Sequence, residues 1–99
     1  MTIANANVAS KSRRPVLTEE EIQIAIKKVV EKLYEKFNKH GFHACSSIHE
    51  SLGFVTEEYD ELVEAVRSGM QFRVKDELED IAVAALFGIA TAEGKKFDW

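Results

Sequence analysis

Hydrophobic residues recur at helical spacing in the segment that follows Thr18. Residues three or four apart lie on the same face of an α-helix, so this recurrence predicts an amphipathic helix that ends near Asn38. Thr18 with Glu21 three residues later forms a capping-box pattern at the start of the helix. The apolar face consists of Ile22, Ile26, Val29, Val30, Leu33 and Phe37. We therefore expect this helix to contribute packing and no chemistry.

Two further helices are predicted on either side of Gly69. The first is capped by Ser46 or Ser47 and stops at Gly69, because glycine commonly follows the last residue of a helix. Its apolar positions are Leu52, Val55, Tyr59, Leu62, Val63 and Val66. The next helix covers about residues 72 to 93, and the short turn folds it back antiparallel. The sequence therefore predicts an all-α fold, an antiparallel helical bundle with three main helices.

Two pairs of carboxylates lie on otherwise apolar stripes of the second and third predicted helices. Glu58 and Glu61 form one pair, and Glu77 and Asp80 form the other. The antiparallel turn brings the two pairs to similar heights. Four carboxylates in apolar surroundings would repel one another and lose solvation unless protons or cations compensate. The pattern therefore predicts a site for a divalent cation.

Composition and charge limit the remaining possibilities. A chain of 99 residues with 45% hydrophobic and 30% charged residues indicates one small folded domain, over residues 18–99. Residues 1–17 contain no acid and are expected to form a flexible tail. The net charge of −4, with more than half of the 17 acids between positions 57 and 80, argues against binding to a nucleic-acid polymer or an anionic membrane. No apolar run approaches the roughly 20 residues that span a bilayer, and no secretory signal is visible, so we expect a cytoplasmic protein.

The single cysteine, Cys45, excludes a disulfide within the chain. His43 and His49 lie close to it in the sequence. Nothing nearby supplies the third, orienting group that nucleophilic catalysis requires, so a catalytic cysteine is not favoured.

The order and spacing of the acids resemble a known family. From His49 the chain reads His-Glu-Ser-Leu, from Glu57 it reads Glu-Glu-x-x-Glu-Leu, and from Lys75 it reads Lys-Asp-Glu-Leu-Glu-Asp. Glu-Glu-x-x-Glu followed on the next helix by Glu-x-x-Asp resembles the MazG-like nucleoside triphosphate pyrophosphohydrolases, all-α proteins of a group that includes dimeric dUTPases and phosphoribosyl-ATP pyrophosphatase. The resemblance covers about residues 49 to 90. The chain departs from the pattern at Gly88, where those domains often carry histidine.

The resemblance implies Mg²⁺-dependent hydrolysis of a nucleoside triphosphate between its α and β phosphates, which yields a nucleoside monophosphate and pyrophosphate. The magnesium ligands that it implies are Glu58, Glu61, Glu77 and Asp80. Glu57 is the candidate to orient or deprotonate the attacking water, although it also fits a solvated polar stripe with Asp60 and Glu64.

Substrate contacts are predicted from cations and aromatic residues near these acids. Arg73 and Lys75 are placed to reach phosphate oxygens, or they are ordinary exposed cations in the first turns of a helix. His49 matches a family position and either contacts substrate or caps the loop. Phe42, His43 and Phe54 are candidates to stack on a base, although the helical spacing of Phe54 indicates a core position.

The apolar stripes present more surface than a three-helix monomer of this size can bury. We therefore expect a homodimer or homotetramer in which oligomerisation completes the bundle. An alternative function is a non-catalytic helical interaction module that uses its acidic face for docking, but docking does not explain why the acids lie on apolar stripes. A di-iron carboxylate bundle would require Glu-x-x-His motifs, which these helices lack.

Overall fold

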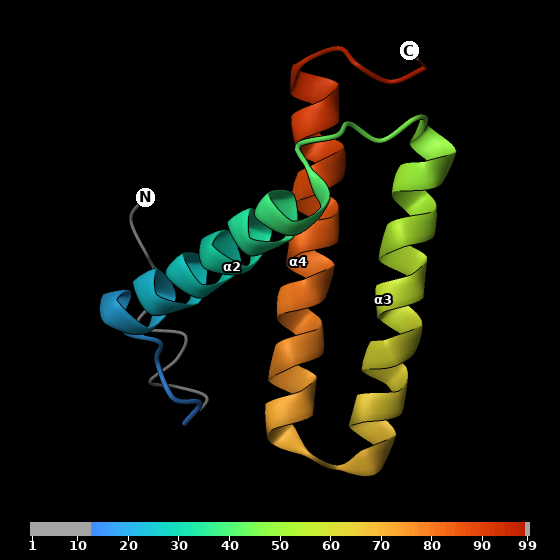
Figure 1. The fold of residues 1–99 in the computed structure, drawn as a ribbon. Helices are drawn as coiled ribbons and strands as arrows, with labels where there is room; N and C mark the ends of the chain where they lie inside the picture. Colours follow the sequence, from blue (N-terminus) through green and yellow to red (C-terminus); the bar gives the residue numbers. More distant parts are fainter. Residues whose placement is uncertain (1–12, 99) are drawn as a thin grey trace.

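The fold is built from three helices, α2 (Glu19–His40), α3 (Ile48–Ser68) and α4 (Gln71–Glu93), in a computed structural model that describes residues 13–98 (Figure 1). No strand occurs among these residues, so the predicted all-α class is confirmed. Most of the predicted N-terminal tail, residues 1–12, lies outside the described residues. None of the three helices combines the length and the apolar character needed to cross a membrane.

Side-chain hydrogen bonds define the start of α2. The Thr18 hydroxyl accepts a hydrogen bond from the Glu21 backbone N–H at 3.1 Å, and the Thr18 N–H donates to Glu21 Oε1 at 2.7 Å. The predicted capping box is therefore present. The helix continues to His40 instead of Asn38, and it ends at Gly41, whose φ of 89° favours glycine.

Helices α3 and α4 form an antiparallel hairpin (Figure 1). Ser47 caps α3 by accepting a hydrogen bond from the Glu50 N–H at 3.2 Å. Gly69 closes the helix in the left-handed conformation, with a φ of 73°. The buried core lies along this hairpin and includes Ala65 and Val83, which are 0% and 2% exposed.

A glycine allows the two helices of the hairpin to approach closely near their open end. Gly88 is buried on α4, and a Cβ atom at this position would meet the side chain of Ser51 on α3. A larger residue at position 88 would therefore require the Ser51 side chain to move.

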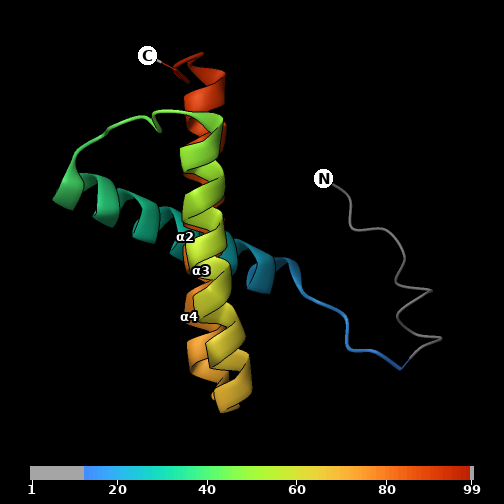
Figure 2. The same ribbon diagram turned by 90° about the vertical axis from the view of Figure 1, so that its right-hand side faces the viewer.

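Helix α2 crosses α4 instead of lying parallel to the hairpin (Figures 1 and 2). Its tertiary contacts are with α4, and none of its residues is buried. Large apolar side chains of α2 remain exposed, and these are Ile24, Ile26, Val30 and Tyr34. Helix α2 therefore packs against α4 alone among the described helices, and much of its apolar surface is exposed.

The loop between α2 and α3 is attached to the C-terminal end of α4. The Cys45 N–H donates to Thr91 Oγ1 at 3.0 Å, and the Asp98 N–H donates to the Ser46 carbonyl oxygen at 2.7 Å. The thiol of Cys45 is fully buried, so this cysteine contributes to packing.

Candidate metal centre

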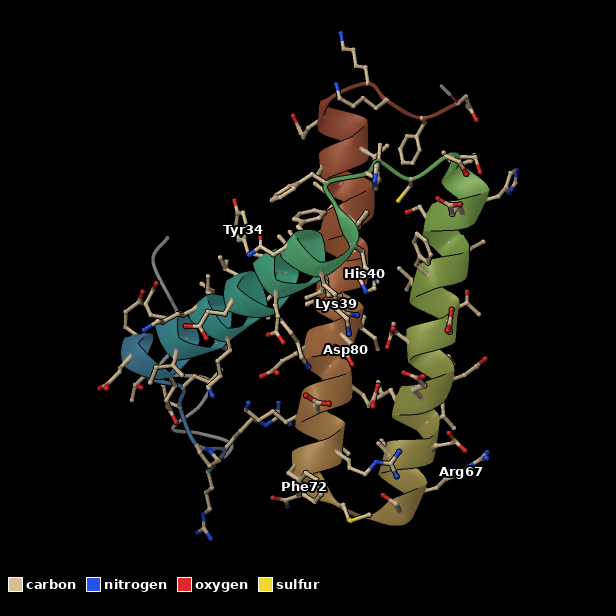
Figure 3. The ribbon with its side chains drawn as sticks, in the orientation of Figure 1. Tyr34, Lys39, His40, Arg67, Phe72 and Asp80 are labelled. Atoms are coloured by element: carbon tan, nitrogen blue, oxygen red, sulfur yellow. The ribbon has the colours of Figure 1, made fainter. Side chains whose placement is uncertain are left out.

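Four carboxylates from α3 and α4 come together as the sequence predicts. One oxygen each from Glu58, Glu61, Glu77 and Asp80 lies within 4.8 Å of the others, and we call these four residues the carboxylate cluster. Each pair projects from one helix face because its members are three residues apart. The antiparallel hairpin then brings the two faces together. Asp80 lies on the side of α4 that faces α3 (Figure 3).

Two oxygen atoms of the carboxylate cluster are buried without a hydrogen-bond partner among the described residues. They are the Oε2 atoms of Glu58 and Glu77. The pKa of Glu58 is raised to about 7, and desolvation by burial is the largest cause. A hydrogen bond with Glu61 and the negative charges of Glu61 and Asp80 also raise it. The same causes raise the pKa of Glu77. An unpartnered buried carboxylate oxygen destabilises the folded chain, so the cluster favours any species that brings positive charge.

Two neighbouring acids on α4 have cationic partners. Lys32 Nζ lies 2.6 Å from Asp76 Oδ1 and 3.4 Å from Glu79 Oε1. Lys75 Nζ lies 2.7 Å from Glu79 Oε2. The hydrogen bond from Lys32 lowers the pKa of Asp76, and that from Lys75 lowers the pKa of Glu79. The negative charges of Asp76 and Glu79 are therefore balanced by lysines of the same chain.

Helix α2 places two lysines beside the carboxylate cluster in addition to its packing against α4. Lys32 Nζ lies 3.0 Å from Asp80 Oδ1, within the carboxylate cluster. Burial alone would lower the pKa of Lys32, but hydrogen bonds to Asp76 and Asp80 raise it. Lys36 lines a cavity with Glu58 and Asp80, and its charge offsets part of the rise in the pKa of Glu58. The sequence feature that could have indicated this pair is the spacing of Lys32 and Lys36, because residues four apart share one helix face.

The other predicted site residues lie outside the carboxylate cluster. Glu57 is exposed on α3, and His49 is exposed in the first turn of that helix. Lys75 is held by Glu79, whereas Arg73 is half-buried near the start of α4. Their catalytic and substrate-binding roles stay predictions.

The aromatic candidates divide into two groups. Phe54 is 40% exposed, so the prediction of a core position for it is wrong. Phe42 stacks on Phe37, with ring centroids 4.6 Å apart, and His43 lies against Gly41. Phe54 is the candidate that lines a cavity together with Glu58 and Asp80, whereas Phe42 and His43 line a different one.

The donor set fits Mg²⁺. Mg²⁺ takes oxygen ligands and is usually held by a few carboxylates together with waters and substrate phosphates. All four members of the cluster offer carboxylate oxygens, and neither histidine nor cysteine belongs to it, so the set does not resemble a zinc site. The two unpartnered oxygens would gain a partner from a bound cation.

Comparisons of the chain with family models, with curated proteins and with solved structures give no significant match. The features of the chain that bear on function are the carboxylate cluster, the lysines beside it and the adjoining cavity.

Proposed function

We propose that this protein is a Mg²⁺-dependent nucleoside triphosphate pyrophosphohydrolase of the MazG-like type. The observation that carries the proposal is the convergence of four carboxylates within 4.8 Å, two of which have a buried oxygen without a partner. A divalent cation compensates such a cluster, and a triphosphate supplies the remaining oxygen ligands. The order of the acids between Glu57 and Asp80 supports this substrate class through the resemblance.

Each residue of the centre has a distinct part in the proposed reaction. The carboxylate cluster holds the cation, and Lys32 restrains Asp80 by engaging its Oδ1 atom. When bound, Mg²⁺ neutralises phosphate charge and lowers the pKa of a coordinated water. The oxygen of the attacking water forms a bond to a phosphorus atom of the α–β linkage as the bridging P–O bond breaks, and Glu57 accepts the proton of the water. The products are a nucleoside monophosphate and pyrophosphate.

A substrate panel tests this proposal directly. The protein is incubated with canonical and modified nucleoside triphosphates, with and without Mg²⁺, and the products are identified. We expect pyrophosphate and the matching monophosphate, in the presence of Mg²⁺ only. Orthophosphate with a diphosphate would contradict the mechanism, and no product from any substrate would favour the interaction module.

We further propose that the chain acts as a homodimer or homotetramer. Large apolar side chains of α2 remain exposed, so a second subunit would find an apolar face to cover. A groove of about 530 Å³ between α2 and α4 offers an entirely apolar contact surface, lined by Ala25, Ile26, Val29, Val30, Ala82, Ala85, Leu86 and Ile89. Light scattering at micromolar concentration tests this, and a stable monomer would contradict it.

A further inference from the structure

A small cavity adjoins the carboxylate cluster. Its volume is about 150 Å³, and all three helices contribute to its lining, which consists of Lys36, Phe54, Glu58, Asp80, Val83, Ala84 and Phe87. Glu58 and Asp80 belong to both the cavity and the cluster. A group bound in the cavity would therefore lie beside the cation.

The cavity has an apolar end and a polar end. Val83 and Ala84 are 2% and 8% exposed and supply a buried apolar surface. The rings of Phe54 and Phe87 meet edge to face, with centroids 6.2 Å apart and an interplanar angle of 63°. Phe37 also packs against Phe87, at a centroid distance of 4.9 Å. An aromatic ring that enters this corner can contact the face of one phenylalanine and the edge of the other.

The volume limits what can enter. An apolar cavity of about 150 Å³ holds a benzene-sized ring, whereas pockets for drug-sized ligands measure about 300–1,000 Å³. The cavity is therefore large enough for one six-membered ring and too small for a whole nucleotide. A fused two-ring base would extend beyond it.

The position of the cavity fits the length of a nucleotide. Phe87 follows Asp80 by about two turns of α4, which corresponds to roughly 10 Å along the helix axis. A sugar can bridge this separation between a base at the phenylalanine rings and phosphates at the carboxylate cluster. Lys36 lies at the polar end, where its positive charge favours the phosphate-bearing side of the ligand.

We propose that this cavity is the subsite for the base of the substrate and that it favours single-ring pyrimidine bases over two-ring purine bases. The inference rests on the proposed function, because the carboxylate cluster must hold the triphosphate. The cavity would be the part of the molecule that selects the base of the substrate.

Binding measurements with uncleavable ligands test the inference. With Mg²⁺ present, titration calorimetry compares the α,β-methylene analogues of UTP and ATP with inorganic tripolyphosphate, which has no base. We expect the UTP analogue to bind about tenfold more tightly than the ATP analogue. Equal affinity for the two analogues would overturn the inference.

Two variants and a matched control place the preference in the cavity. Ala84→Leu fills the cavity, and Phe54→Leu removes one ring from a half-exposed position, so at least the second variant should retain the fold. We expect both to remove the pyrimidine preference while tripolyphosphate binding stays unchanged. Tyr59→Leu removes another ring from α3, 56% exposed and outside the cavity, and should leave every affinity unchanged.

The outcomes separate the inference from the proposed function. If tripolyphosphate and both analogues fail to bind with Mg²⁺, the proposed function is wrong, and the base subsite is wrong with it. If tripolyphosphate binds but Phe54→Leu keeps the wild-type affinities for both analogues, only the base subsite is wrong.

Discussion

Neighbouring acids on α4 have opposite surroundings. Asp76 and Glu79 contact Lys32 or Lys75, and their pKa values are lowered. Glu77 follows Asp76 directly, yet it has a buried oxygen without a partner and a raised pKa. All three side chains carry a carboxylate and lie on the same helix, so the direction in which each side chain leaves the helix decides whether it meets a lysine. Asp76 and Glu79 therefore stabilise the fold through ion pairs, whereas Glu77 is suited to hold a cation. Asp80 has both properties, because it belongs to the carboxylate cluster and also contacts Lys32.

Replacing one acid of each kind tests this separation most strongly. Glu77→Gln should weaken Mg²⁺ binding and turnover by about 100-fold or more, while the melting temperature stays equal or rises because charge repulsion is relieved. Asp76→Asn should leave Mg²⁺ affinity within about twofold and lower the melting temperature slightly, because its ion pair is largely exposed. Calorimetric Mg²⁺ titration and thermal unfolding measure both effects. Equal Mg²⁺ affinities for the two variants would show that Glu77 is no more important for cation binding than Asp76.

Glu57 and Glu58 offer the same comparison on α3, because one is exposed and the other belongs to the carboxylate cluster. Glu57→Gln should lower turnover by about 100-fold while Mg²⁺ binding is retained, as expected for a residue that handles the proton of the attacking water. Steady-state rates and Mg²⁺ titration measure the two properties. Glu64→Gln on the same polar stripe is the control and should change neither. Wild-type turnover in Glu57→Gln would assign this residue to the solvated surface.

Removal of Lys32 should affect stability more than any single paired acid. Lys32→Met leaves Asp76, Glu79 and Asp80 without their shared cation, and we expect a loss of about 1–2 kcal/mol, moderated by the exposure of Asp76. For a chain of this size, each kcal/mol lowers the melting temperature by about 4–8 °C. Lys27→Met, at an exposed position of α2, is the control for thermal unfolding. An unchanged melting temperature in Lys32→Met would show that these ion pairs do not stabilise the fold.

The pH dependence of stability should give the smallest effect. The folded-state pKa of Glu58 is raised from 4.5 to about 7, so between these values the folded chain binds more protons than the unfolded chain, and its stability falls as pH rises. The lowered pKa values of Asp76 and Glu79 act below this range and do not oppose the fall.

Thermal unfolding of the Mg²⁺-free protein should therefore show a melting temperature that falls by about 2–8 °C from pH 5 to pH 8. Glu58→Gln should flatten the profile, and millimolar Mg²⁺ should offset the fall by binding the folded state. A melting temperature that rises across this range in the wild type would contradict the assignment.

The carboxylate cluster could be predicted because its determinants are local. The three-residue spacing places Glu58 with Glu61 and Glu77 with Asp80, and the turn at Gly69 sets the two helices against each other. The part played by Lys32 could not be predicted in this way. It depends on how α2 crosses α4, and the apolar stripe of α2 is compatible with several crossing directions.

Phe54 illustrates a second limit of the sequence pattern. Helical spacing places it on the apolar side of α3, but the side chain is 40% exposed beside a cavity. Periodicity gives the direction of a side chain around its own helix and does not tell whether a neighbouring helix covers that point. The cavity beside Phe54 therefore could not be predicted from the sequence.

The short turn at Gly69 and Met70 has a consequence for the order of folding. It places both halves of the carboxylate cluster in one hairpin, so the loop that must close is short and its entropy loss is small. Contacts between segments close in sequence form quickly, whereas docking of α2 requires a more distant encounter. A cation can thus bind the hairpin while α2 is still undocked and favour its assembly during folding. Lys32 and Lys36, which α2 carries, would then reach the carboxylate cluster after the ion.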